Sequence, residues 1–275
     1  MKTVIVTDNG AGFSADEIKK LGIKTLSLRF FIDEVEYDDF VSDDVFFDKI
    51  ISAKTISTSQ PSISDVEEVF KDLLKEYDNI LYMPMSSGLS GTYNTGKTIE
   101  KDFDGKVFTV DTRKISVLQK FAVLDAIDFI NRGISPSEIR NIFEKNKNNT
   151  SIYIMVDTLD FLKKGGRVSP LVAKIGNLLQ IKPIMFSDGG KFEVAKKERT
   201  VKNAKEKMIE LIKDDMKGKF GDMDTMKYML GVAYTSNVLW ANELRDSIKE
   251  NFGEFKREVK NYIIIYQFLK KYKLK

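Results

Sequence analysis

Short runs of β-branched residues alternate with longer amphipathic segments along almost the whole chain, and this alternation constrains the fold most. Runs such as 4–7 and 152–156 are typical of buried strands, whereas segment 116–131 has helical spacing. Such alternation predicts mostly parallel sheets covered by helices, and therefore an α/β protein. We expect strands at 4–7, 25–31, 80–83, 107–110, 152–156, 181–186, 191–196, 228–233 and 258–265, and helices near 15–20, 43–51, 65–76, 91–102, 116–131, 136–147, 169–178, 200–216 and 237–251.

Local signals refine this outline. A serine followed three positions later by glutamate predicts capped helix starts at Ser14, Ser64 and Ser135. The polar run 145–150 is linker-like, so we expect an N-terminal domain at 1–150 and a C-terminal domain at 151–275. A glycine-rich turn within 181–196 predicts a hairpin, which adds antiparallel pairing to the second half.

Composition excludes several function classes. The chain has 44 basic and 41 acidic side chains, so its net charge of +3 gives no reason to expect a nucleic acid partner. It contains neither cysteine nor histidine, which excludes thiolate nucleophiles, zinc–sulfur sites and histidine-based catalytic triads. No apolar run reaches the roughly 18 residues of a membrane span. The sequence opens directly into a strand pattern without a signal peptide, and we expect a cytoplasmic protein.

Two runs of hydroxyl-bearing and glycine residues, 57–62 and 86–92, each precede a predicted helix. Hydroxyl groups and free backbone N–H groups at a helix start suit a carboxylate or a phosphate, because the helix dipole also favours negative charge there. Two such runs in one domain predict a site for an acidic head group. The alternative is that they are ordinary helix caps and turns, where Ser, Thr and Gly are favoured anyway.

Polar residues also follow several predicted strands, at Asp8, Asp111, Asp157 and Thr235. In open α/β sheets ligands bind beyond the carboxyl ends of the strands, so these residues are candidates for a ligand site. The alternative is that they only cap the helices that follow.

Eight short motifs follow one another in order along nearly the whole chain: Thr7-Asp8, Thr58-Ser59-Gln60-Pro61-Ser62, Ser86-Ser87-Gly88-Leu89-Ser90-Gly91-Thr92, Val110-Asp111-Thr112, Asp157-Thr158-Leu159, Gly165-Gly166-Arg167, Ile181-Lys182-Pro183-Ile184 and Lys197-Glu198-Arg199-Thr200. Taken together, these stretches resemble the DegV family, which includes the fatty-acid-binding subunits of bacterial fatty acid kinase.

The resemblance implies a two-domain α/β fold, with an N-terminal three-layer α/β/α domain around a mostly parallel sheet and a C-terminal α/β domain with a mixed sheet. It also implies a buried interdomain tunnel for one long-chain fatty acid, and no enzymatic activity, cofactor or metal ion of the chain's own. The fatty acid carboxylate would be held by Thr58 and Ser90. Four further residues would complete the cradle: Ser59, Ser87, Gly91 and Thr92.

The resemblance further implies a partner, a separate kinase subunit that binds ATP and phosphorylates the bound carboxylate. Arg167 and Arg199 occupy the positions that dock this subunit in bacterial relatives. The alternative is that they are surface arginines bonded to a helix end or a carboxylate.

One stretch departs from the family pattern. Family members usually end with a His-x-Gly-Pro-Gly stretch near the head group, whereas this chain continues Tyr266-Gln267-Phe268 and carries no histidine. The contribution of that histidine to the site is therefore missing here.

Other function classes fit less well. An enzyme acting on a small phosphorylated or sugar-like substrate could use the same glycine and hydroxyl loops. Residues 91–98 match the pattern Gly-x-x-x-x-Gly-Lys-Ser/Thr, but they lie inside the helix expected at 91–102 and not in a loop that precedes a helix, as a P-loop does. A serine hydrolase built on Ser90 lacks both a nucleophile elbow and the usual general base. A scaffolding protein would have neither ligand nor turnover.

Overall fold

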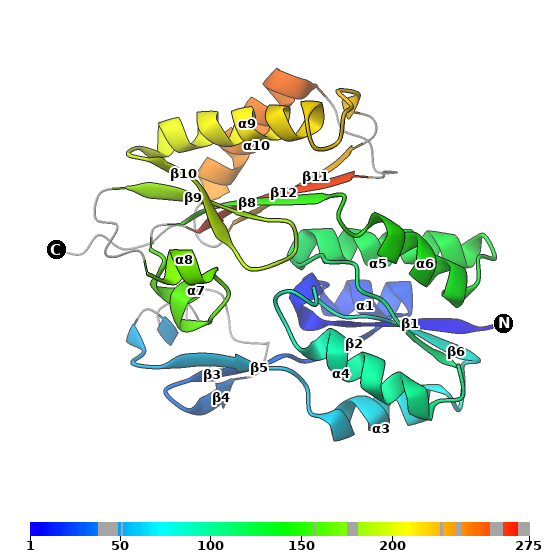
Figure 1. Cartoon of the computed structure of the whole chain (residues 1–275). Coiled ribbons are helices and arrows are strands. Elements are labelled where there is room, and N and C mark those ends of the chain that lie inside the picture. The colour runs from blue at the N-terminus through cyan, green and yellow to red at the C-terminus, as the bar shows by residue number, and fades with distance from the viewer. Residues whose placement is uncertain are drawn as a thin grey trace. The chain divides into compact units, whose positions relative to one another are not determined.

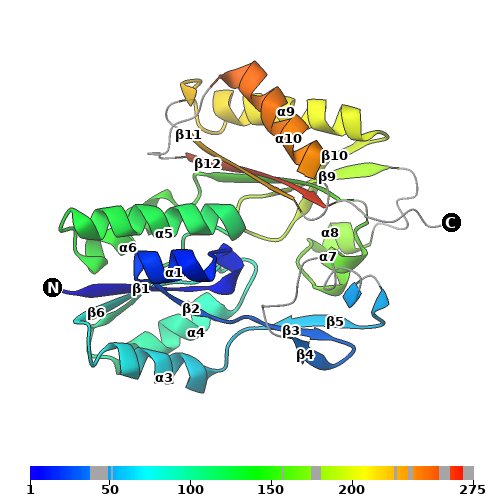
Figure 2. The same ribbon diagram turned by 180° about the vertical axis from the view of Figure 1, so that it is seen from behind.

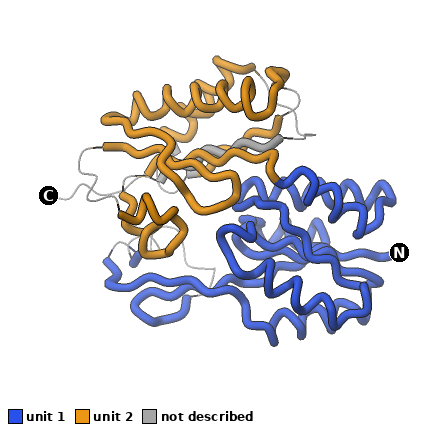
Figure 3. The backbone as a smooth tube through the Cα atoms, viewed as in Figure 1, with its two compact units in different colours: residues 1–147 blue, residues 148–275 orange. Residues whose placement is uncertain are grey.

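The computed structural model describes residues 1–37, 49–50, 52–156, 158–174, 181–225, 228–234, 238–253 and 261–268. The chain divides into two compact units, unit 1 at Met1–Lys147 and unit 2 at Asn148–Lys275 (Figure 3). The expected helix at 43–51 falls largely outside the described residues, as do Asp157, Thr235 and the second half of the expected helix at 169–178.

Unit 1 is built on a four-stranded parallel sheet in the order β2-β1-β6-β7. Its central strands are buried along most of their length, because helices cover both faces. The topology confirms the predicted parallel sheet. The strands are β1 (Thr3–Asp8), β2 (Lys24–Leu26), β6 (Asn79–Met83) and β7 (Val107–Thr109).

Successive residues of a strand point to opposite faces, and the two cores of unit 1 follow from this alternation. Val4, Val6 and Tyr82 pack with α3 (Ile63–Leu73) and α4 (Thr92–Ile99), whereas Ile5, Leu81 and Met83 pack under the helices of the other layer. Figure 1 shows the resulting three layers of unit 1. The helices of the other layer are α1 (Ala15–Leu21), α5 (Ser116–Asn131) and α6 (Pro136–Asn146).

A second, smaller sheet of unit 1 was not expected from the sequence. The predicted strand at 25–31 divides into β2 and β3 (Arg29–Ile32), and β3 pairs antiparallel with β4 (Val35–Tyr37) and β5 (Ile56–Ser59). The first hydroxyl run therefore begins inside a strand and not in a loop. The described part of unit 1 also contains two short 3-10 helices, η1 (Asn9–Ala11) and η2 (Glu100–Asp102).

Two of the three predicted capping boxes are confirmed, at Ser14 and Ser135. The third prediction, Ser64, is wrong, since Ser62 caps α3 and pairs with Asp65. Aspartate three residues after a serine serves the same purpose as glutamate, so the helix begins earlier than a serine–glutamate pair predicts.

Unit 2 contains a five-stranded mixed sheet in the order β10-β9-β8-β12-β11. The strands β8, β12 and β11 are parallel to one another, and β9 and β10 add the predicted antiparallel hairpin at the edge opposite β11. The fold is therefore the predicted α/β class with a mixed second sheet. The strands are β8 (Thr150–Val156), β9 (Lys182–Ser187), β10 (Glu193–Glu198), β11 (Tyr228–Tyr234) and β12 (Asn261–Phe268).

Two long helices, α9 (Val201–Lys217) and α10 (Val238–Phe252), cover one face of this sheet (Figure 2). Met208 and Ile212 of α9 and Leu244 of α10 are buried against Met155 of β8 and Tyr228 of β11. Two short helices, α7 (Asp160–Lys164) and α8 (Pro170–Ala173), precede the hairpin. No helix within the described parts of the chain is long and apolar enough to span a membrane.

Gly96 of α4 lies where a side chain would not fit. A β-carbon at this position would approach the Tyr82 ring to 2.7 Å and Thr109 Cγ2 to 2.9 Å, so α4 packs against β6 and β7 through the bare glycine backbone. The absence of a side chain at Gly96 therefore sets how closely the helix approaches the sheet.

We expect Gly96→Ala to lower the free energy of unfolding by about 1–3 kcal/mol because it overpacks this contact. An alanine in a helix interior normally stabilises by up to about 1 kcal/mol over glycine, so the expected sign is the reverse of helix propensity. Urea unfolding measures the change in the free energy of unfolding for Gly96→Ala. Asn94→Ala, at an exposed position of the same helix, is the control. Equal or greater stability of Gly96→Ala would contradict the packing argument.

Candidate functional site

The second hydroxyl run forms a tight loop between β6 and α4. The backbone N–H groups of Leu89 and Ser90 both donate to the carbonyl oxygen of Ser86, each at 3.0 Å, and the N–H of Gly88 donates to Ser86 Oγ at 3.2 Å. Ser86 is buried, and the three hydrogen bonds that it accepts hold the loop in this conformation. The loop delivers Gly91, which has no side chain, to the N-terminus of α4.

A buried carboxylate at the end of β1 holds one side of this loop. Asp8 Oδ2 accepts the N–H of Met85 at 2.6 Å, and Asp8 Oδ1 accepts Gln119 Nε2 at 3.0 Å. Burial raises the pKa of Asp8 to about 6, although the hydrogen bonds from Met85 and Gln119 act in the opposite direction. Gln119 Nε2 also donates to Thr7 Oγ1 at 3.1 Å, which connects α5 to the same strand end.

A second buried carboxylate, at the end of β7, holds the other side. Asp111 Oδ2 accepts the Ser87 hydroxyl at 2.7 Å, and Asp111 Oδ1 accepts the N–H of Ser87 at 3.3 Å and that of Arg113 at 3.1 Å. Lys147 Nζ lies 3.6 Å from the same carboxylate. Because the single Ser87 proton goes to Asp111, the Ser87 hydroxyl orders the loop and has no proton left for a ligand.

The structure brings the two hydroxyl runs into contact through Gln60. Gln60 Nε2 donates to Thr95 Oγ1 of α4 at 2.8 Å, and a β-carbon on Gly91 would lie 2.6 Å from Gln60 Oε1. Glycine at position 91 therefore leaves room for the end of the Gln60 side chain. The end of β5 and the start of α4 consequently lie side by side.

The expected carboxylate ligands lie on these two adjoining segments. Thr58 and Ser59 are the exposed last residues of β5, paired with Phe30 and Arg29 of β3. Ser90 is partly exposed at the end of the loop, directly before Gly91. The assignment of Thr58 and Ser90 to a carboxylate stays a prediction.

The Ser90 hydroxyl has a close partner within its own run. Ser90 Oγ lies 2.7 Å from Thr92 Oγ1 and accepts the backbone N–H of Thr92 at 3.3 Å. Thr92 is 1% exposed, so its hydroxyl faces the protein interior. The expected cradle residues therefore differ in access, because Ser90 reaches the surface and Thr92 does not.

The two expected docking arginines flank β10 in unit 2. The carbonyl oxygen of Arg167 accepts the N–H of Phe192 at 2.8 Å just before β10, and Arg199 directly follows the strand. Arg199 lies seven positions after Phe192, so roughly 23 Å of extended chain separates the two ends of β10. Arg199 is exposed, whereas the Arg167 guanidinium is half-buried and donates to the carbonyl oxygen of Gly165.

Sequence reasoning missed two buried side chains near the loop, Gln119 and Lys114. Lys114 is 1% exposed, and burial lowers its pKa to about 7 against the opposing effect of Asp125 and Asp111. Its Nζ donates to the carbonyl oxygen of Thr112 at 3.1 Å, and its own carbonyl accepts the N–H of Ser86 at 3.0 Å. Nothing in the local sequence distinguishes this lysine from a surface lysine.

Two hollows lie elsewhere in the described structure. One, of about 400 Å³, is lined by Phe31, Glu34, Thr55 and Ser57. Ser57 and Thr58 are neighbours in β5 and point to opposite faces, so this hollow lies on the face away from Thr58.

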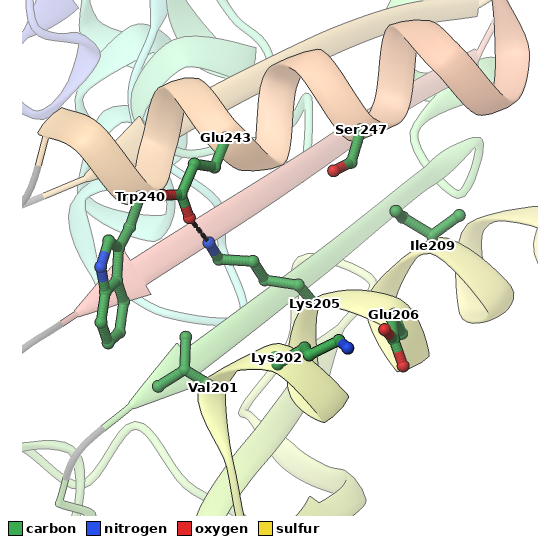
Figure 4. A pocket seen from close by; sticks show the side chains of 8 residues that line it. All are labelled: Val201, Lys202, Lys205, Glu206, Ile209, Trp240, Glu243 and Ser247. Atoms are coloured by element: carbon green, nitrogen blue, oxygen red, sulfur yellow. Dashed lines mark hydrogen bonds and ion pairs between the residues drawn. The ribbon is translucent and has the colours of Figure 1, made fainter.

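The other hollow, of about 480 Å³, lies between α9 and α10 (Figure 4). Lys205 crosses it to pair with Glu243 and lies 5.3 Å from the centre of the Trp240 ring. These contacts join the two helices. Neither hollow is lined by Thr58 or Ser90. Within the described ranges, no three acidic side chains cluster closely enough to hold a metal ion.

Comparison with known proteins identifies relatives over nearly the full length. A DegV domain-containing protein of Clostridium perfringens is 32% identical over 261 residues, which cover 91% of this chain and 88% of that protein. A DegV family protein from Thermus thermophilus, described by its fatty acid binding, has a TM-score of 0.79 at 26% identity and covers 97% of this chain and 92% of its own.

A second solved structure has the same likeness. DegV from Bacillus subtilis, described as a fatty acid binding protein, has a TM-score of 0.78 at 26% identity, again covering 97% of this chain and 92% of its own. The family described as "Uncharacterised protein, DegV family" matches residues 2–266. Because the family match and these relatives span nearly the whole chain, the chain belongs to the DegV family.

Proposed function

We propose that this chain binds one long-chain fatty acid, with the carboxylate held at the junction of β5 and the loop before α4. The observation that carries the proposal is the contact of Gln60 with Gly91 and Thr95, which places the two hydroxyl runs side by side. The solved relatives from Thermus thermophilus and Bacillus subtilis, both described as fatty acid binding, support the same ligand class.

The chemistry of the junction suits a carboxylate. A carboxylate removed from water needs several hydrogen-bond donors, and hydroxyl groups and helix N-terminal amides supply them without a positive charge. Thr58 and Ser90 are the two donors, and Gly91 directly follows Ser90 at the start of α4. Ser59 follows Thr58 in β5 but points, like Ser57, to the opposite face of the strand. The acyl chain extends from this point into an apolar tunnel, where each buried methylene contributes about 0.8 kcal/mol.

We expect the double variant Thr58→Ala/Ser90→Ala to bind oleate more weakly by about 2–4 kcal/mol, because the carboxylate loses charge-assisted hydrogen bonds. Titration calorimetry measures the affinity after delipidation, and mass spectrometry of freshly purified protein measures the copurified acyl chain. Ser57→Ala is the matched control, since Ser57 is an exposed hydroxyl on the opposite face of β5. If the double variant keeps the wild-type affinity, the head group binds elsewhere.

The proposal includes presentation of the bound fatty acid to a separate ATP-binding kinase subunit. The chain then has no catalytic role of its own and needs no cofactor or metal ion. Arg199 supports this function, because it is exposed directly after β10, one of the two edge strands of the unit 2 sheet. Arg167 at the other end of β10 would extend the docking surface, although its guanidinium also bonds Gly165.

We expect Arg199→Glu to weaken the affinity for a purified fatty acid kinase ATP-binding subunit about tenfold. A reversed charge at an interface replaces attraction by repulsion and lowers the association rate. Arg245→Glu, an exposed arginine of α10, is the control and should leave the complex unchanged. The measurements are surface plasmon resonance and phosphorylation of bound oleate. Equal losses in both variants would indicate a general charge effect, and ATP turnover by the isolated chain would contradict the non-catalytic role.

A further inference from the structure

The hydroxyl groups of Ser90 and Thr92 share one hydrogen bond whose direction matters. A hydroxyl has one proton to donate and two lone pairs that accept. Ser90 Oγ already accepts the N–H of Thr92 at 3.3 Å, and Thr92 Oγ1 lies 2.7 Å away. If Thr92 donates, both lone pairs of Ser90 are occupied and its proton must point to a third group.

Burial decides the direction. Thr92 is 1% exposed, and among the described residues its hydroxyl has Ser90 Oγ as its hydrogen-bond partner. A buried hydroxyl that only accepted would leave its own proton unsatisfied, which costs free energy. Ser90 is partly exposed, so its proton can reach a ligand or water. The favoured arrangement therefore runs from the Thr92 hydroxyl to Ser90 Oγ, and from the Ser90 proton outward.

We infer that Thr92 is a positioning residue that makes Ser90 an obligate donor to the bound carboxylate, without contacting the ligand itself. The inference rests on the proposed fatty acid function. A hydroxyl that accepts a hydrogen bond is a stronger donor, because bonds in a chain polarise one another. Ser87 lies in the same loop but gives its proton to Asp111, so the loop separates one ordering hydroxyl from one ligand-directed hydroxyl.

The test compares oleate with oleyl alcohol, which has the same chain and a neutral head group. Thr92→Val keeps the side-chain shape and removes the donor, so we expect about tenfold weaker oleate binding and about threefold weaker alcohol binding, since charge-assisted bonds are roughly twice as strong. Thr92→Ser restores the hydroxyl and should bind both ligands within about twofold of wild type. Thr92→Ala repeats the test if the valine variant does not fold.

A double-mutant cycle with Ser90→Ala completes the experiment. If Thr92 acts through Ser90, then Thr92→Val causes no further loss of oleate affinity once Ser90 is alanine. Wild-type affinity for oleate in Thr92→Val, equal losses for oleate and alcohol, or additive losses in the cycle would each overturn the inference. Failure of the wild-type chain to bind oleate would overturn the proposed function, and the inference with it.

Discussion

Two buried carboxylates that accept backbone N–H groups fix the loop on which the candidate site depends. Asp8 takes the amide of Met85 and Asp111 takes the amide of Ser87, so the β6–α4 connection is held from the ends of both neighbouring strands. Isolated carboxylates are costly to bury, and these bonds offset part of the cost. The shape of the loop therefore depends on the parallel sheet itself, because the strand order places β1 and β7 on either side of β6.

Much of the architecture could be predicted because local patterns and tertiary packing agree. Segment 116–131 was expected as a helix and forms α5 over the same residues, and β1 and β8 differ from prediction by two residues or fewer at each end. The strand β5 was missed since Ile-Ser-Thr-Ser is short and polar, and its strand geometry comes from pairing with β3. The strand conformation of β5 therefore depends on tertiary contacts, which a local sequence pattern does not contain.

The candidate site was predictable to a similar extent and for a similar reason. The two hydroxyl runs and the aspartates at strand ends have recognisable local signatures, and the structure joins the runs through Gln60. Gln119 and Lys114 have no such signature, because their burial depends on how α5 and the segment after β7 pack over the strand ends. The difference in solvent exposure between Ser90 and Thr92 likewise could not be predicted from the sequence, because both are hydroxyl residues of one motif.

The close approach of Gln60 to Gly91 has an evolutionary consequence. A β-carbon at position 91 would lie only 2.6 Å from Gln60 Oε1, so a larger residue there would displace the end of the Gln60 side chain from its place beside Thr95. The two segments are far apart in the chain, but substitution in one restricts the choices open to the other. They are therefore expected to covary among homologues, so that a lineage changing its ligand would alter both segments together.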